Sequence, residues 1–325
     1  MIFKFLKGGV SGGGKARRWF KFQQSMSKKR WFELDREKNG PIALFDFSDF
    51  NDAVDAALID EGPKKGGWRI SDDSTIGGYS KGKFQLIRNP QDYQQVMQGK
   101  EAGSLLEAME KGEINEKDYN DTYKSDDKVN DDDAESVEEE ITVSDHGDDT
   151  QTKKKFIPFV RWNGTIDTRI DENSEVQRSG FCAIRSPEFP FGGADLGGRY
   201  NALEILCRSD GRPYSLNLKV DTFIPEDIFQ TFINVPPTYE PDATICPETG
   251  GKFDRVVLLF QHFIVTAGGR MRSTQRDLDN SVRIETIGLT LMDGVDGDFQ
   301  FDLARIRAVN YDERGIIYNK AKVPQ

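Results

Sequence analysis

The stretch NALEILCRSDGRPYSLNLKV, residues 201–220, decides the fold class. Apolar side chains alternate with mostly polar ones on both sides of its centre, and the apolar set is Leu203, Ile205, Cys207, Tyr214, Leu216, Leu218 and Val220. A period of two is typical of a strand with one buried face. Between the two runs, Asp210-Gly211 predicts a tight turn, because glycine can take the positive φ that such turns need. The stretch therefore predicts a β-hairpin from an antiparallel sheet.

Similar runs recur along the second half of the chain. The expected strands are 156–170, 180–186, 201–208, 213–220, 228–235, 254–265, 283–292 and 299–309, separated by Gly, Pro, Asn and Asp. Many short strands without helices between them indicate an all-β antiparallel sandwich and not a parallel α/β sheet. Further upstream, Ser48 or Asp49 predicts the start of a short helix that runs to Leu58.

Charge is distributed very unevenly along the 325 residues. Residues 101–150 hold 19 acidic residues against 4 lysines, whereas the whole chain has a formal net charge of −11. A segment so acidic cannot bury enough apolar surface to fold by itself. We expect a β-sandwich domain at 40–312 that is interrupted by an acidic disordered insertion at 90–155, with a short helix near Ser104–Lys111. The insertion is either a protein-binding arm or a solvated loop.

The two ends of the chain lie outside this expected domain. Residues 1–32 hold 9 Lys or Arg and no acid, which is the charge balance of a mitochondrial targeting segment and also of a basic tail. Residues 313–325 form a C-terminal tail. There is no apolar run near the roughly 18 residues that a membrane-spanning helix needs.

Few residues suited to catalysis or metal binding are present. The chain has three cysteines, no CxxC motif and two histidines, and we interpret His262 as an ordinary residue of a strand. Glu204 and Asp221 are the only carboxylates we single out as a possible glycosidase pair. Asp293 to Asp298 resembles a calcium loop, but it lacks the spacing and the glutamate of one, so a hairpin turn is favoured. We predict no enzyme activity, cofactor or metal.

A set of short motifs occurs in a specific order. They are Trp68, Ser71-Asp72-Asp73, Gly77-Gly78-Tyr79-Ser80, Gly180 to Ser186, Asp195-Leu196, Tyr200, Leu203-Glu204-Ile205, Arg208 to Tyr214, Ile287-Gly288-Leu289 and Asp293 to Gly297. In order and spacing they resemble the complex I intermediate-associated protein 30 family, over roughly residues 40–90 and 155–312. The resemblance implies a galactose-binding-like jelly roll and a role in assembling mitochondrial NADH:ubiquinone oxidoreductase.

Polar residues at strand ends and turns are the candidates for partner binding. The set is Arg185, Asp210, Arg212, Tyr214, Asn217 and Gln230. Arginine and tyrosine are favoured interface anchors, and the alternative is that Asp210 and Gly211 make the turn and Arg185 pairs with an acid. A second group, Arg270, Arg272 and Arg276, predicts an exposed loop that touches an acidic partner or lipid headgroups, or is simply solvated.

The resemblance implies a non-catalytic, chaperone-like protein of the mitochondrial matrix, with peripheral contact to the inner membrane as an option. The implied partners are membrane-arm intermediates of complex I, the adaptor ECSIT and an acyl-CoA-dehydrogenase-like protein. Nucleic acid is not expected, because the body of the chain is mildly acidic. A carbohydrate-binding module is the alternative, with Trp68 and Trp162 as the aromatic residues available for sugar stacking.

Overall fold

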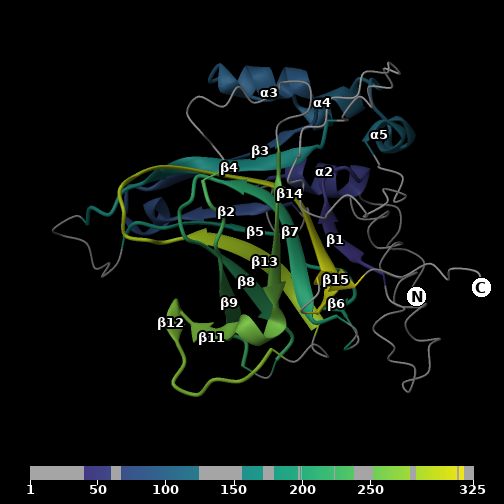
Figure 1. The fold of residues 1–325 in the computed structure, drawn as a ribbon. Helices are drawn as coiled ribbons and strands as arrows, with labels where there is room; N and C mark the ends of the chain where they lie inside the picture. Colours follow the sequence, from purple (N-terminus) through teal and green to yellow (C-terminus); the bar gives the residue numbers. More distant parts are fainter. Residues whose placement is uncertain are drawn as a thin grey trace, which may run out of the picture.

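The computed structural model describes residues 40–59, 67–123, 156–170, 179–196, 198, 200–222, 224–237, 252–278, 283–312 and 315–317. They form two antiparallel sheets that pack face to face, with helices beside one of them (Figure 1). The predicted antiparallel jelly-roll sandwich is confirmed. The expected targeting segment 1–32 lies outside the described residues, and of the tail only Gly315–Ile317 lies within them.

Sheet A has seven strands and sheet B has eight. The order in sheet A is β10 (Asp254–Leu259), β7 (Ala202–Ser209), β14 (Gly297–Asp312), β4 (Phe159–Ile166) and β3 (Lys81–Ile87), and β14 also pairs with β1 (Ile42–Asp46) and β15 (Gly315–Ile317). The order in sheet B is β12 (Arg270–Met271), β11 (Ile264–Ala267), β9 (Ile228–Ile233), β8 (Tyr214–Val220), β13 (Arg283–Leu291), β5 (Cys182–Arg185) and β2 (Arg69–Asp72), and β13 also pairs with β6 (Ala194–Asp195).

The predicted hairpin at 201–220 is wrong, although both of its strands exist. β7 lies in sheet A and β8 in sheet B, so the turn at Asp210-Gly211 crosses from one sheet to the other. β7 already pairs with β10 on one side and β14 on the other, which leaves no free edge for β8. Gly211 does take a positive φ of 87°. Alternation shows which side of a strand is buried, but it does not identify the neighbouring strand.

Two further expectations fail for the same reason. The segment Asp293 to Asp298 joins β13 in sheet B to β14 in sheet A, so it is a second crossing and not a hairpin. The expected strand 254–265 is two strands, β10 and β11, in different sheets. A 3-10 turn at Phe260–His262 separates them and holds His262 exposed, outside any strand.

The first part of the expected disordered insertion is ordered. Residues 90–123 form α3 (Pro90–Met97), α4 (Leu105–Glu110) and α5 (Glu116–Tyr123), while 124–155 lies outside the described residues. Side-chain oxygens of Asn89 and Ser104 cap α3 and α4. The hydroxyl of Tyr119 donates to the Phe47 carbonyl at 2.8 Å, which ties α5 to the lead-in strand. The burial of a few aromatic residues therefore stabilises this segment despite its polar composition. The expected lead-in helix is α2 (Phe50–Ala57), capped by Asp49, and is confirmed.

A buried charge cluster lies on the outer side of sheet A. Both oxygens of Asp302 accept from Arg161, at 2.8 and 2.9 Å, and one also accepts from Arg208 at 2.6 Å. None of the three side chains is more than 3% exposed. Tyr93 of α3 covers this cluster, with the Arg161 guanidinium 5.4 Å from the centre of its ring. The helices therefore seal charged groups as well as apolar ones.

Asp73 joins two segments that are distant in sequence. Its carboxylate accepts from the main-chain N–H and hydroxyl of Ser80, at 2.8 and 2.9 Å, from the Ser179 hydroxyl at 3.0 Å and from the Gly180 N–H. A Cβ on Gly78 would lie 2.3 Å from the Asp73 carboxyl carbon, so this position requires glycine. The motifs around Asp73, Gly78 and Gly180 are thus parts of one hydrogen-bonded junction between β2, β3 and β5.

Breaking the buried charge cluster should destabilise the protein strongly. Asp302→Asn removes the carboxylate that two buried guanidinium groups bind, and we expect the free energy of unfolding to fall by about 3–5 kcal/mol. Urea denaturation measures the loss. The control is Asp298→Asn on the same strand, an exposed carboxylate for which the change should stay within about 0.5 kcal/mol. Equal effects of the two variants would contradict the role of the cluster.

The Asp73 junction should make stability depend on pH. Burial alone would raise the pKa of Asp73, but the hydrogen bonds from Gly180, Ser80 and Ser179 outweigh it and lower the pKa. A lowered carboxylate pKa stabilises the fold above the unfolded value of about 3.9, and this contribution is lost as the pH falls below it. We expect Asp73→Asn to be less stable at about pH 6 and to lose less stability than the wild type on acidification to about pH 3. Parallel pH profiles of the two proteins would contradict this.

A candidate partner-binding face on sheet B

Three of the six predicted site residues lie in one row across sheet B. Arg185 of β5 is opposite Gly288 of β13, Gly288 is opposite Asn217 of β8, and Asn217 is opposite Gln230 of β9. Side chains of directly opposed residues point to the same side of a sheet. Their chain neighbours, such as Ile184, are buried between the sheets, so this row lies on the outer side.

The middle of this outer side carries small residues. Around Gly288 the neighbouring outward positions are Ala183, Thr290 and Ser215, which follow one another across β5, β13 and β8. A Cβ on Gly288 would lie 3.0 Å from the carbonyl oxygen of Ile184, which makes this position tight for any larger residue. Gly288 and Ser215 are buried and Ala183 and Thr290 are half-buried, so the exposed groups of this side lie toward its two ends.

The two ends of this side differ in chemistry. At the β2–β5 end, Arg69 and Arg185 are directly opposite each other, and neither makes an ion pair with an acid in the described part of the chain. At the β9–β12 end, Phe232, Ile264 and Met271 are 55%, 37% and 69% exposed. We call the surface formed by Arg69, Arg185, Gly288, Asn217, Gln230, Phe232, Ile264 and Met271 the sheet B face. The described helices lie on the sheet A side and leave it open (Figure 1).

The other three predicted residues lie at the corner where the chain crosses between sheets. One oxygen of Asp210 accepts from the Arg212 N–H at 3.0 Å, and the other accepts from the Tyr214 hydroxyl at 3.0 Å and the Gln300 N–H at 2.8 Å. Tyr214 is completely buried beside Phe301, with ring centres 4.8 Å apart. Asp210 and Tyr214 thus hold the crossing turn together, as the structural alternative in the sequence analysis expected of this turn.

Arg212 links the two crossing turns. Its guanidinium donates to both carboxylate oxygens of Asp293, at 2.8 and 2.7 Å, and to the carbonyls of Val295, Gly297 and Asp298. Burial would raise the pKa of Asp293, but this ion pair holds it below its usual value. We call the Arg212–Asp293 pair the corner clamp. Its donors are occupied within the fold, so Arg212 also serves the crossing turns.

The possible glycosidase pair, Glu204 and Asp221, does not form. Glu204 belongs to β7 in sheet A, where its buried carboxylate makes a two-point ion pair with Arg307 and lies within 3.6 Å of Arg255. Asp221 is exposed just after β8 in sheet B. The Glu204 carboxylate is bound by arginines in sheet A, whereas Asp221 follows a strand of sheet B. The two carboxylates therefore cannot act together on one glycosidic bond. Within the described residues, no group of three or more His, Cys, Asp or Glu is placed as metal ligands would be.

The remaining candidates have structural explanations or lie outside the described residues. Burial raises the pKa of the Cys182 and Cys207 thiols to about 12, so both stay protonated at neutral pH. Arg272 and Arg276 both bind Asp227, at 3.1 and 2.9 Å, and only Arg270 of that group is left exposed with no described partner. His146 and Cys246 are outside the described residues. No described helix is both long and apolar enough to cross a membrane.

The sequence analysis missed the apolar end of the sheet B face. In the run IFQTFI of β9, Ile228, Gln230 and Phe232 point outward in alternation. An aromatic residue among outward positions is a signal that alternation alone could have revealed. Arg69 could not have been found in this way, because only the register of β2 with β5 places it beside Arg185.

The corner clamp should be sensitive to a conservative change. Arg212→Lys keeps the charge but cannot reproduce the two-point contact with Asp293 or the carbonyl contacts, so we expect a loss of about 1–3 kcal/mol in unfolding free energy. Thermal and urea denaturation measure it. Arg185→Lys, the matched control on the sheet B face, should change stability by less than about 0.5 kcal/mol. A similar loss in both variants would count against the clamp.

Two of the solved structures that this chain is similar to are carbohydrate-binding modules. The family 11 module of the cellulosomal cellulase Lic26A-Cel5E of Clostridium thermocellum has a TM-score of 0.32 and 11% identity, covering 48% of this chain and 78% of that one. A family 11 module in complex with a mixed-linked tetrasaccharide has a TM-score of 0.30 and 13% identity, over 47% and 76%. Neither similarity bears on function.

Sequence comparison is more informative. Residues 150–303 match the family model described as complex I intermediate-associated protein 30. Two relatives carry that name with the word mitochondrial. The Neurospora crassa protein is 23% identical over 192 residues, 54% of this chain and 61% of the relative. The Mus musculus protein is 28% identical over 145 residues, 43% and 41% of the two chains. The chain thus spans less than two thirds of either relative. The resemblance that the motifs pointed to is confirmed: residues 150–303 of this chain match the complex I intermediate-associated protein 30 family.

Proposed function

We propose that this protein is a non-catalytic, chaperone-like assembly factor for mitochondrial respiratory complex I. The observation that carries the proposal is the match of residues 150–303 to a family whose relatives are named for association with complex I intermediates. Both relatives are named as mitochondrial, which supports a mitochondrial location for this chain. We place it in the matrix, with peripheral contact to the inner membrane as an extension of the proposal.

The sheet B face is the proposed contact surface for assembly intermediates. Its exposed Phe232 and Met271 are residue types enriched at interfaces, and Arg185 adds a cation that has no described counter-charge. A partner segment that suits it is apolar at the β9–β12 end and acidic at the β2–β5 end. The proposed partners are membrane-arm intermediates, the adaptor ECSIT and an acyl-CoA-dehydrogenase-like protein.

The carbohydrate-binding alternative loses the residues on which it depended. Sugar sites of this kind stack a sugar ring on an exposed aromatic side chain. Trp68 and Trp162 are each only 1% exposed and pack against Phe84 and Tyr214 in the core. We therefore do not propose it.

A complementation experiment tests the function and the surface separately. Cells that lack the protein should contain little assembled complex I and accumulate sub-complexes on native gels, and the wild type should restore assembly. Arg185→Glu combined with Phe232→Ala changes both ends of the sheet B face, so we expect this variant to accumulate normally but to restore less than about a tenth of assembly, since hot-spot losses commonly exceed 2 kcal/mol. Met97→Ala with Lys100→Glu, a matched pair on the helix side, should restore it fully.

The outcomes separate the two claims. Unchanged complex I in cells that lack the protein would refute the proposed function. Full restoration by the Arg185→Glu, Phe232→Ala variant would refute the sheet B face and leave the function standing. Equal failure of the helix-side control would show that the effect is not specific to the face.

A further inference from the structure

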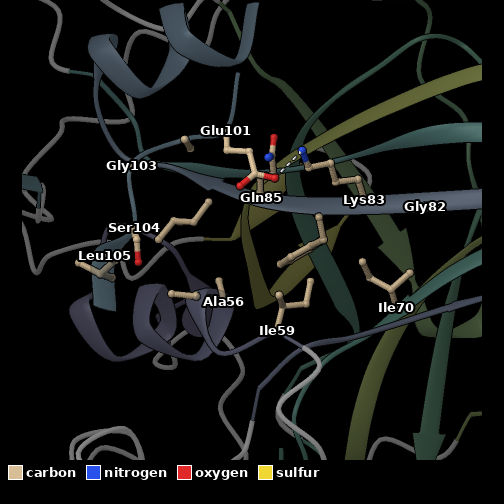
Figure 2. Close-up of a pocket in the computed structure, with 14 residues that line it drawn as sticks. Ala56, Ile59, Ile70, Gly82, Lys83, Gln85, Glu101, Gly103, Ser104 and Leu105 are labelled. Atoms are coloured by element: carbon tan, nitrogen blue, oxygen red, sulfur yellow. Dashed lines mark hydrogen bonds and ion pairs between the residues drawn. The ribbon is translucent and has the colours of Figure 1, made fainter. Parts of the chain in front are cut away.

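A cavity of about 390 Å³ lies between α2, β3 and the loop that leads into α4 (Figure 2). Its apolar lining includes Ala56, Ile59, Ile70 and Leu105. At its rim Lys83 and Glu101 form an ion pair at 3.3 Å, drawn as a dashed line in Figure 2. Ligand pockets in proteins range over roughly 300–1,000 Å³, so this cavity is large enough to hold part of a ligand. No role assigned above involves it.

One wall of the cavity is the edge of a sheet. Among the strands that the structure describes, β3 is the last of sheet A and pairs with β4 alone. The N–H of Gly82 donates to the carboxylate of Asp72 at 3.3 Å and therefore points away from β4. In an antiparallel ladder this direction alternates along the strand. The main-chain groups of Phe84 and Leu86, which follow at intervals of two, must then also point away from β4 and into the cavity.

The register at the other side of the sheet leads to the same result independently. On β14, the N–H and carbonyl of Gln300 bond to Asp210, on the β7 side. Its neighbour Phe301 must therefore bond to the opposite strand, β4, where its register partner is Trp162. The main-chain N–H and C=O of Trp162 therefore bond to β14 and point away from β3. Its register partner on β3 is Phe84, which is thus not bonded to β4.

The edge of β3 thus presents a row of main-chain donors and acceptors to a partly apolar cavity. Within the described residues, no hydrogen bond outside the β3–β4 ladder reaches the main chain of Phe84 or Leu86. Main-chain groups that are removed from water without a partner are costly, and a strand laid alongside would satisfy them. We propose that this cavity binds an extended peptide segment of a protein partner, which adds as a further strand to the free edge of β3.

The surroundings define the chemistry of that peptide. Alternate residues of an added strand point to opposite sides. One set would face the apolar lining at Ala56, Ile70 and Leu105. The other set would lie on the exposed side, beside Lys81 and Lys83 and the carboxylates of Asp72 and Glu101. The segment is therefore expected to alternate apolar and polar residues. The site is separate from the sheet B face and does not require the proposed function.

Hydrogen exchange of the free protein tests the geometric premise. The amides of Phe84 and Leu86 should exchange at least about tenfold faster than those of Lys83 and Gln85, which bond to β4, since a lost main-chain hydrogen bond leaves an amide open to solvent. Mass spectrometry with single-residue fragmentation resolves the four positions. Equal protection of all four would mean that the edge is already occupied, and would overturn the proposal.

A phage-displayed library of linear peptides tests binding. It is selected on the wild-type protein and counter-selected on Ala57→Trp, a change that fills the cavity from partly buried Ala57. We expect enriched peptides that alternate apolar and polar residues, whose synthetic copies protect Phe84 and Leu86 from exchange at least about tenfold. Phe232→Ala, on the sheet B face, should bind them like the wild type. Enriched peptides that leave both amides unprotected, or a library that yields none, would overturn the proposal.

Backbone methylation of the selected peptide provides a control that does not alter the protein. N-methylation of either the odd-numbered or the even-numbered residues gives two modified peptides. One of them should bind at least about tenfold more weakly and the other should change much less, because only one of the two sets of N–H groups points at β3. An equal effect in both peptides would show that side chains alone carry the binding, and would refute strand addition.

Discussion

The corner clamp is the interaction on which the arrangement of the two sheets depends. Arg212 lies on the turn that carries the chain from β7 to β8, and Asp293 lies on the turn from β13 to β14. β7 pairs with β14 in sheet A, and β8 pairs with β13 in sheet B. Joining the turns therefore fixes two central ladders at one point. A shift of one residue in either ladder would turn its buried side outward and would also break the clamp.

Strand patterns in the sequence carry information about burial but not about strand pairing. The alternation in 201–220 located β7 and β8 to within a residue or two, since burial on one side leaves that trace. It could not show that they belong to different sheets, because the partner of a strand is set by residues distant in sequence. The helix α4 agrees with the predicted helix near Ser104–Lys111, but α3 and α5 were missed because their buried residues, Tyr93 and Tyr119, are few and widely spaced. The average composition of a segment does not reveal such isolated contacts.

The same limit applies to the candidate site residues: the sequence does not show which of them face outward. Arg185 and Arg212 are the same residue type at similar positions, one before a turn and one within it. Arg212 is held in the corner clamp because Asp293 lies beside it, whereas the side chain of Arg185 is exposed. Asp293 is 81 residues from Arg212 in the chain, so the local sequence could not reveal this contact. Arg185, Asn217 and Gln230 share a row because β5, β13, β8 and β9 are in register. The sequence supplied the right chemical types, and the topology decided which of them face outward.

Arg69 and Arg185 have a consequence for the ionic conditions of binding. Two guanidinium groups directly opposite each other on neighbouring strands repel, and in the free protein small anions from solution reduce that repulsion. A carboxylate from a partner that lies between them would displace those anions. Both the repulsion and the attraction act near the surface and are screened over roughly 8–10 Å at physiological ionic strength. The counter-ion content of the compartment would therefore set how strongly this end of the sheet holds an acidic segment, without any change in the fold.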